Sequence, residues 1–321
     1  MNETLPSYRH AFPSMGSTVE ILLVSHNAAE QEALTTFGLA ERLAAEWERT
    51  FSRFTPESEI SRLNARAGRP VPVSELLYAA IEIALDGSRL TGGLFDPTIL
   101  RALAGLGYDR TFDEIADDGR QWLSPTPAPG IAGIRLGPEQ RVVTLPSNTH
   151  IDLGGVVKGL YVDMLAGSGS WVGGAISAGG DLRVWGIPPT GDRWIIGVED
   201  ADDPSRDAAQ LHLDRGAVAT SGTNRRAWRR GGVLLHHLID PRTGLPAERG
   251  IRTASVFGAT AVQAEIAATA LVVGGLEDPV VRSLIRQAVV ILDDGEIVTV
   301  RDAMGGQVDV INLTSCATIA A

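Results

Sequence analysis

The sequence has almost no cysteine. Cys316 is the only one among 321 residues, so the chain can build neither an internal disulfide framework nor a thiolate metal site. Such usage suits a reducing compartment.

Long apolar runs are also missing. The N-terminus, "MNETLPSYRHAFPSMGSTVEILLV", lacks a basic region followed by an apolar stretch, and no window approaches 18 uninterrupted apolar residues. We therefore expect no signal peptide, no transmembrane helix, no stable membrane insertion and a cytoplasmic location. Export of a longer precursor stays open.

Net positive charge is lacking as well. The formal net charge is −11, and so acidic a surface repels phosphate backbones. We expect no nucleic-acid partner, although a locally basic pocket is compatible with this balance.

Several common catalytic motifs are absent. The chain has no Walker loop, no Gly-x-Gly-x-x-Gly fingerprint between a strand and a helix, no His-Glu-x-x-His helix and no Gly-x-Ser-x-Gly elbow. "GSGSWVGG" is rich in glycine, but its spacing predicts an ordinary loop.

What is present predicts a mixture of helices and adjacent strands, hence an α+β fold. One domain is expected over residues 1–302, with a tail over 303–321. Ser58, Ser74 and Thr260 are expected to cap helices. Strands are predicted at 17–24, 141–145, 182–187, 194–199, 217–222, 233–240 and 251–258, with a hairpin around Asp294-Gly295.

"DLGGVVKG" predicts a strand, a glycine turn and a helix that begins near Gly154-Gly155. A helix N-terminus attracts phosphate, and Lys158 adds a positive charge one turn further on. On these residues alone a tight turn with a surface lysine is favoured over an anion site.

"AEIAATAL" puts Glu265 and Thr269 four residues apart, on one face of a predicted helix. A carboxylate and a hydroxyl are oxygen ligands of the kind that magnesium prefers. A solvated Glu265, with Thr269 bonded to its own helix, is the favoured alternative from this stretch alone.

Two further stretches could contribute to a site. Asp181 in "SAGGDLRVWG" follows a glycine turn, where an ordinary turn aspartate is the default. In "HHLIDPRTG" the adjacent His236 and His237 point to opposite faces if they lie on a strand, so only one can enter a site.

Together these stretches resemble the FAD:protein FMN transferase family, the ApbE-like flavin transferases. The resemblance covers about residues 12 to 300 and rests on the order of eight segments: "MGSTVEI", "FSRFTPESEISRLN", "GGLFDPTI", "IDLGGVVKGLYVD", "SAGGDLRVWG", "AVATSG", "HHLIDPRTG" and "AEIAATALVVGG". It implies an α+β fold related to the T-fold.

The resemblance also implies FAD and Mg²⁺ as ligands. By position, the FAD contacts would be Met15, Phe54, Leu94, Phe95, Asp96, Asp152, Lys158, Asp181 and the backbone near Ile239. The metal would be held by the carbonyl of Gly155, by Glu265 and by Thr269, and His237 would be the catalytic base beside Lys158.

This chain departs from the family at two of these positions. Phe54 replaces a flavin-stacking tyrosine, and a phenyl ring can still stack without the hydroxyl. Glu265 replaces an aspartate, so we expect weaker or displaced metal binding, because magnesium demands near-ideal geometry.

The implied activity is a magnesium-dependent transfer of FMN from FAD onto a threonine or serine of a target flavoprotein, with release of AMP. An FAD pyrophosphatase that makes FMN and AMP is one alternative, and a non-catalytic protein that binds or delivers FAD is another.

Overall fold

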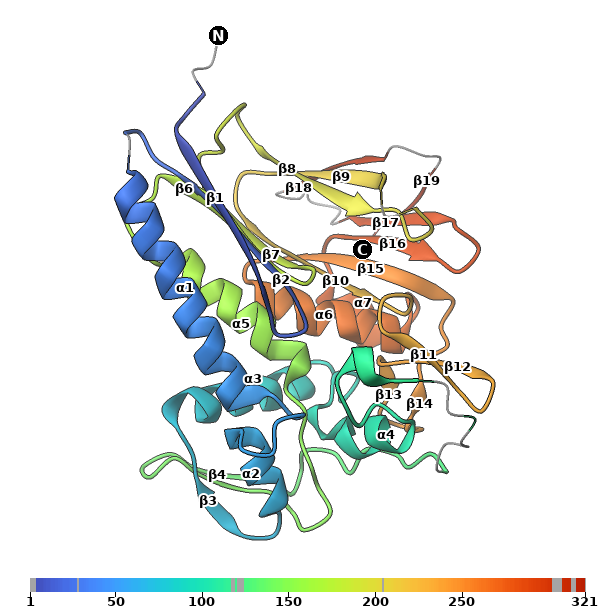
Figure 1. Cartoon of the computed structure of the whole chain (residues 1–321). Helices are drawn as coiled ribbons and strands as arrows, with labels where there is room; N and C mark the ends of the chain where they lie inside the picture. The colour runs from blue at the N-terminus through green and yellow to red at the C-terminus, as the bar shows by residue number, and fades with distance from the viewer. Residues whose placement is uncertain are drawn as a thin grey trace.

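A nine-stranded sheet runs through the centre of the computed structural model, which describes residues 4–27, 29–116, 119, 124–203, 205–301, 308–312 and 316–320. The strand order is β1-β2-β6-β7-β10-β15-β16-β17-β19. Neighbours in this sheet are antiparallel except β17 and β19 (Figure 1). Its strands are β1 Ser7–Ser14, β2 Ser17–Val24, β6 Gly173–Ala178, β7 Asp181–Gly186, β10 Gly216–Gly222, β15 Ile251–Gly258, β16 Ala288–Leu292, β17 Ile297–Arg301 and β19 Cys316–Ala320.

Helices cover one face of this sheet, and smaller sheets surround it. The helices are α1 Glu30–Phe51, α2 Glu59–Ala65, α3 Glu75–Leu90, α4 Leu100–Gly105, α5 Gly154–Ala166, α6 Ala261–Gly274 and α7 Pro279–Leu284, with 3-10 turns η1 Pro97–Ile99 and η2 Phe112–Glu114. The remaining strands are β3 Pro70–Pro72, β4 Arg135–Gly137, β5 Val142–Thr144, β8 Trp194–Glu199, β9 Asp207–Leu213, β11 Ala227–Arg230, β12 Val233–His236, β13 Ile239–Asp240, β14 Leu245–Pro246 and β18 Val308–Asn312.

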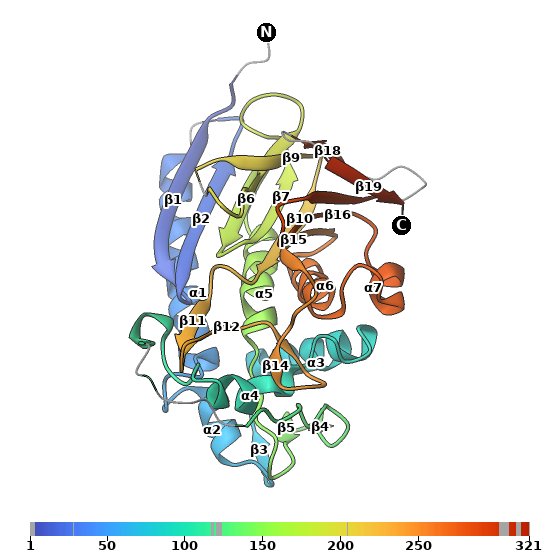
Figure 2. The same cartoon turned by 90° about the vertical axis from the view of Figure 1, so that its right-hand side faces the viewer.

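The core lies in layers on both faces of the large sheet. Helices α1, α5 and α6 lie along one face, and β8 and β9 lie against the other (Figure 2). Burial of aliphatic and aromatic side chains between these layers is the main stabilising term, at roughly 25 cal/mol for each Å² of apolar surface removed from water. The α+β prediction is confirmed.

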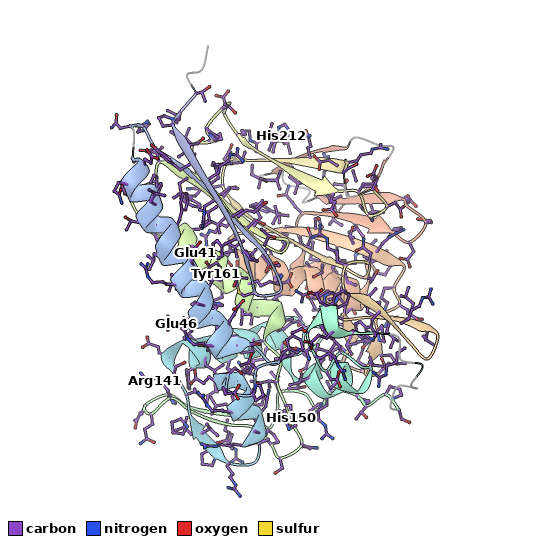
Figure 3. All side chains as sticks on the ribbon, in the orientation of Figure 1. Glu41, Glu46, Arg141, His150, Tyr161 and His212 are labelled. Atoms are coloured by element: carbon purple, nitrogen blue, oxygen red, sulfur yellow. The ribbon has the colours of Figure 1, made fainter. Side chains whose placement is uncertain are left out.

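Two long-range hydrogen bonds fix the position of helix α5 relative to α1. Tyr161 donates its hydroxyl to the carbonyl of Ala40 at 2.8 Å, and Trp47 donates its indole N–H to the carbonyl of Val157 at 2.8 Å. Figure 3 shows Tyr161 between the two helices. Both side chains are almost fully buried, so the start of α5 has a rigid support.

The predicted caps are confirmed. Ser58, Ser74 and Thr260 each accept a backbone N–H in the first turn of their helices. The hairpin between β16 and β17 also turns where expected, at Gly295, whose φ of +87° favours glycine.

Other predictions were wrong in detail. The strand predicted directly before α5 is absent, because residues 149–153 run into the helix without forming one. Residues 233–240 form two short strands, interrupted at His237 and Leu238. Strand β1 was not predicted, and it pairs with β2 through a turn at Met15 and Gly16, which both have positive φ.

The tail over residues 303–321 stays a prediction, and two of its segments form strands. Residues 308–312 pair with β9, and residues 316–320 pair in parallel with β17. A pattern of single apolar residues was too weak to predict these strands, whose pairing depends on distant partners. The single domain over residues 1–302 stays a prediction. In the part of the chain that is described, no helix is both long and apolar enough to cross a membrane.

Candidate active site

Helix α5 begins at Gly154, as the glycine pair predicted. The N–H of Gly154 donates to Oδ1 of Asp152 at 2.6 Å. A Cβ on Gly155 would lie 2.8 Å from the Phe95 ring, and one on Gly159 would lie 2.8 Å from the backbone of Val262 in α6. Glycine at these positions therefore lets α5 approach both α6 and the turn that precedes η1.

Lys158, one turn into α5, reaches a buried carboxylate. Its Nζ lies 3.4 Å from Oδ2 of Asp181, the first residue of β7. Asp181 is 1% exposed, and apart from Lys158 and the carboxyl group of Glu265 its oxygens have no polar partner among the described residues. Burial raises the pKa of Asp181, although Lys158 opposes this shift.

Glu265 of α6 lies next to Asp181. It is buried, and burial together with the charge of Asp181 raises its pKa to about 8. Two carboxyl groups this close cannot both ionise cheaply in the absence of a cation. The pair therefore holds a proton in a position where a metal ion could replace it.

Two hydroxyls complete an oxygen-rich cluster. Ser221 of β10 lies 3.5 Å from Oε2 of Glu265 and 3.3 Å from Oγ1 of Thr269. Among the described residues, no three His, Cys, Asp or Glu side chains converge on one point. The donor set is instead two carboxylates and two hydroxyls, all hard oxygen ligands that fit Mg²⁺ better than a softer metal.

His237 lies at the same site, at the end of β12. Burial is the main cause that lowers its pKa to about 3, and Arg226, His236 and Lys158 lower it further. Its Nδ1 is buried and has no partner among the described residues. The ring is therefore neutral at physiological pH, which is the form that can accept a proton.

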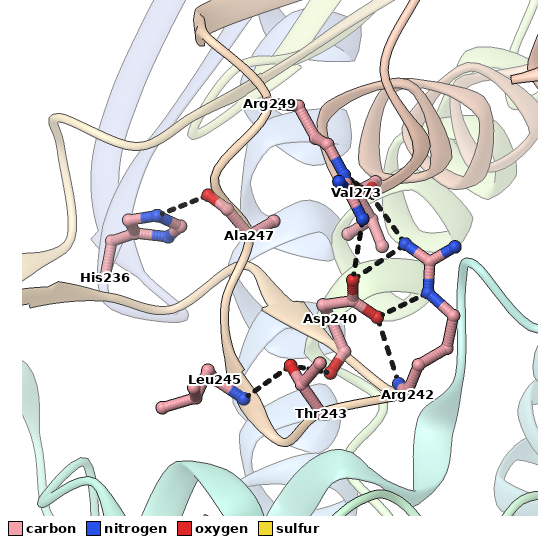
Figure 4. Close-up of polar contacts among 8 residues, drawn as sticks. All are labelled: His236, Asp240, Arg242, Thr243, Leu245, Ala247, Arg249 and Val273. Carbon is pink, nitrogen blue, oxygen red and sulfur yellow. Dashed lines mark hydrogen bonds and ion pairs between the residues drawn. The ribbon is translucent and has the colours of Figure 1, made fainter. Parts of the chain in front are cut away.

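The neighbouring His236 has different surroundings. Its Nε2 lies 3.1 Å from the carbonyl of Ala247, a contact drawn in Figure 4. Only His237 has Lys158 and Arg226 among the charges that act on it. The surroundings of His237 favour it over His236 as the site residue, and its role stays a prediction.

A second group of residues connects the start of α5 with Phe54. Nε of Arg53 lies 2.8 Å from Oδ2 of Asp152, and its guanidinium donates to the carbonyl of Tyr108 at 2.7 Å. The guanidinium also lies 4.2 Å from the centre of the Phe54 ring and 4.3 Å from that of Tyr108. Arg53 thus fixes both an aromatic ring and the carboxylate that caps α5.

The segment at 94–96 is mostly buried. Leu94 and Phe95 are 5% exposed and lie in two different core clusters. Asp96 accepts both the N–H and the hydroxyl of Thr98 at 2.7 Å, and burial raises its pKa. A ligand contact from this turn would therefore come from its backbone.

Met15 and Ile239 lie at opposite edges of this region. The N–H of Met15 donates to Oε1 of Glu48 at 2.8 Å, which fixes the turn of the first hairpin. A Cβ on Gly16 would lie 3.8 Å from the guanidinium of Arg226, so this turn faces the site. Ile239 is 2% exposed, which leaves its backbone as the group available to a ligand.

The structure thus brings together Lys158, Asp181, Glu265 and Thr269, with His237 beside them. The described neighbour of Gly155 is Phe95, outside this cluster, and the role of its carbonyl stays a prediction. Sequence reasoning missed Arg53, Ser221 and Arg226, although Arg53 and Ser221 lie within segments that it had singled out, and Arg226 lies four residues after one of them.

Known proteins provide an independent comparison. The model of the ApbE family matches residues 15–290. An FAD:protein FMN transferase of Treponema pallidum is 30% identical over 254 residues, which are 73% of this chain and 70% of the relative.

Solved structures match over a still longer span. The ApbE protein of Thermotoga maritima superposes with a TM-score of 0.78 at 26% identity, over 91% of this chain and 96% of its own. The flavin transferase ApbE of Vibrio cholerae gives a TM-score of 0.75 at 25% identity, over 92% and 96% of the two chains.

Proposed function

The chain belongs to the ApbE family, and on that premise we propose that it is an FAD:protein FMN transferase. It would use Mg²⁺, attach FMN to a threonine or serine of a target flavoprotein, and release AMP. Curated relatives that carry this name support the transferase activity; the metal, the attachment residue and the leaving group are our proposals.

The observation that carries the proposal is the state of Asp181. A carboxylate that is 1% exposed, with only Lys158 and another buried carboxyl group as polar partners among the described residues, costs free energy in the folded protein. The adjacent Glu265, itself buried, adds to that cost. A divalent cation bound there would offset it, and this supports a metal site built into the fold.

Glu265, Thr269 and the carbonyl of Gly155 would hold the ion, with Asp181 and Ser221 beside them. When bound, Mg²⁺ supplies positive charge that polarises the pyrophosphate and stabilises the departing phosphate. Lys158, which extends from the first turns of α5, supplies further positive charge next to the same phosphates.

The remaining steps depend on groups of this chain. Neutral His237 would accept the proton of the acceptor hydroxyl while that oxygen attacks the FMN phosphorus. A new phosphorus–oxygen bond forms to the acceptor, the bond between the two phosphates breaks, and AMP leaves. The negative charge of the pyrophosphate would neutralise the positive charges of Lys158 and Arg226, which lower the pKa of His237 in the free protein. The pKa of His237 would therefore rise when FAD binds, and His237 would become a stronger base.

Phe54, fixed by Arg53, would stack on the isoalloxazine ring. Contacts of Asp152, Asp181 and the backbone around residues 94–96 and 239 would extend along the dinucleotide. Since these contacts would extend beyond the FMN half of the dinucleotide, FAD should bind better than FMN.

One experiment separates the proposal from its alternatives. The protein is incubated with FAD and Mg²⁺, with and without an acceptor flavoprotein domain, and AMP, free FMN and covalent flavin fluorescence are followed. Covalent flavin on the acceptor, lost in excess chelator and lost when the acceptor hydroxyl is removed, supports the transferase. Free FMN alone identifies a pyrophosphatase, and no turnover of bound FAD identifies a non-catalytic binder.

A further inference from the structure

Strands β11 and β12 form a two-stranded hairpin (Figure 2). Arg226 directly precedes β11 and His237 directly follows β12, and Ala227 pairs with His236 between them. The strands turn at Gly231 and Gly232, which have φ values of +56° and +80°. At about 3.3 Å per residue, the turn lies roughly 13 Å from the histidine end.

One face of the hairpin is anchored in the protein. Trp228 and Leu235 are opposite each other and are 5% and 3% exposed. The indole N–H of Trp228 donates to the carbonyl of Leu106 at 3.0 Å. Its ring packs 5.3 Å from that of Tyr108, the residue that Arg53 contacts. The hairpin is therefore a fixed part of the region around the site.

Two apolar side chains of the hairpin, one on the other face and one beside the turn, are open to solvent. Leu234 is 62% exposed and Val233 is 45% exposed, although they are consecutive residues of a strand. Arg229 pairs directly with Leu234 and is also exposed. An exposed apolar pair rimmed by a charged residue is the kind of surface that can bind another protein.

The charge of this segment is opposite to that of the chain. Residues 215–239 contain five arginines and no aspartate or glutamate, in a protein with a net charge of −11. Arg225 is paired with Glu199, and Arg226 acts on the site. Arg229, whose guanidinium donates to the carbonyl of Gly232 in the same turn at 3.3 Å, is left on the outer face.

We propose that Arg229, Val233 and Leu234 of this hairpin dock the acceptor flavoprotein, through an apolar contact and an acidic segment beside its attachment hydroxyl. This inference rests on the proposed transferase function. A partner bound on a surface that leads directly into His237 has its hydroxyl delivered to the base, and an arginine-rich surface on an acidic protein attracts an acidic partner selectively.

The test uses the acceptor domain that the wild-type protein flavinylates. Leu234→Ser and Arg229→Glu should each raise the KM for the acceptor, by about threefold and about tenfold. The affinity for FAD and the slow release of AMP to water should stay at wild-type values. Arg229→Lys should keep most of the wild-type KM, because charge and not a specific turn contact is required.

Matched controls come from exposed residues elsewhere. Ile195 is 58% exposed on β8, and Ile195→Ser removes a comparable apolar side chain. Arg9→Glu makes the same charge change on exposed Arg9 in β1. Both controls should leave the KM for the acceptor unchanged.

The outcomes separate the two proposals. If the wild type flavinylates no acceptor, the transferase function fails, and the docking proposal fails with it. If the wild type is active but the hairpin variants match their controls, docking alone is rejected. A change in oligomeric state with an unchanged acceptor KM would also reject it, because the surface would then bind a second copy.

Discussion

Two buried aspartates of this protein differ in their hydrogen-bond partners. Asp181 is 1% exposed and Asp240 is 5% exposed. Asp240 accepts from the N–H, Nε and Nη2 of Arg242 at 3.0, 2.8 and 2.7 Å, and from Nη2 of Arg249 at 3.2 Å (Figure 4). Asp181 accepts no bond from an arginine or a backbone N–H in the described part of the chain, and its polar neighbours are Lys158, in an ion pair, and the carboxyl group of Glu265.

Their pKa values differ accordingly. Burial opposes the ionisation of Asp240, but the hydrogen bonds and charge of Arg242 lower its pKa overall. Burial dominates at Asp181 and raises its pKa. A carboxylate whose lone pairs are satisfied is part of the structure, whereas one without donors is available to a ligand.

The comparison extends along α6. Arg242 and Arg249 also donate to the carbonyl of Val273, near the C-terminal end of that helix, at 3.4 and 3.2 Å. Glu265 and Thr269, earlier in the same helix, lie in the oxygen cluster. The C-terminal end of α6 is thus stabilised by two arginines that are paired with Asp240. This fixes the helix that carries Thr269 and Glu265, and the burial of Glu265 is unfavourable.

The largest expected effect comes from breaking the reactive region. His237→Ala should lower the rate of FMN transfer by about 10²- to 10⁴-fold while the affinity for FAD changes little, because a base acts in the transition state. Lys158→Ala should lower both the rate of transfer and the affinity for FAD, since the charge of Lys158 interacts with the pyrophosphate both in the bound state and in the transition state. Transfer rates and FAD titrations measure the two quantities, and wild-type transfer by His237→Ala would refute the assignment of the base.

The aspartates themselves give the next effect. Asp240→Asn should lower the free energy of unfolding by about 2 kcal/mol, because charge-assisted hydrogen bonds are lost. Asp181→Asn in excess chelator should be as stable as the wild type or more stable, because it removes one of two adjacent buried carboxyl groups and leaves Glu265 to balance the charge of Lys158. Urea unfolding of the two variants checks this, and an equal loss at both positions would remove the distinction.

A smaller effect concerns the region around Phe54. Arg53→Ala should raise the KM for FAD about tenfold with a smaller change in kcat, because Phe54 and Asp152 lose their common support. Arg53→Lys should not restore the wild-type KM for FAD, since an ammonium cannot lie flat between two rings and bind a carboxylate in the same way. Arg66→Ala, on the exposed end of α2, is the control. Full rescue by lysine would show that only the charge matters.

The smallest effect is on acid stability. Because the pKa of His237 is lowered to about 3, the unfolded chain binds a proton that the folded protein does not, between that pH and about 6.5. Stability should therefore fall as the pH drops through this window and be complete above it. His237→Asn should lose about 0.7 kcal/mol less between pH 7 and pH 6 than the wild type. Parallel pH profiles would contradict the burial of a neutral ring.

Much of this arrangement could be predicted from local sequence. The period of apolar residues and the caps at Ser58, Ser74 and Thr260 determine helices within a few residues of chain. Spacing on one helix face was sufficient to put Glu265 beside Thr269. The resemblance to known flavin transferases then associated Lys158, Asp181 and His237 with one site.

The rest depends on contacts that no local pattern encodes. Ser221 enters the cluster because β10 pairs with β7 and β15, which are distant in sequence. Arg53 matters because its guanidinium meets Tyr108 and Asp152, 55 residues and 99 residues further on. The strands near the C-terminus likewise exist only through pairing with β9 and β17.

The central claim is that the carboxylates of Asp181 and Glu265 form part of a magnesium site. It is tested most directly by the unfolding temperature as Mg²⁺ is added in the presence of FAD, for wild type, Glu265→Asp and Glu265→Ala. At a hundredfold excess over its dissociation constant, a bound ion adds about 2.7 kcal/mol, or several degrees. The wild type should show this rise, Glu265→Asp should show as much or more, and Glu265→Ala should show none. An equal rise in Glu265→Ala, or no rise in the wild type, would contradict the account.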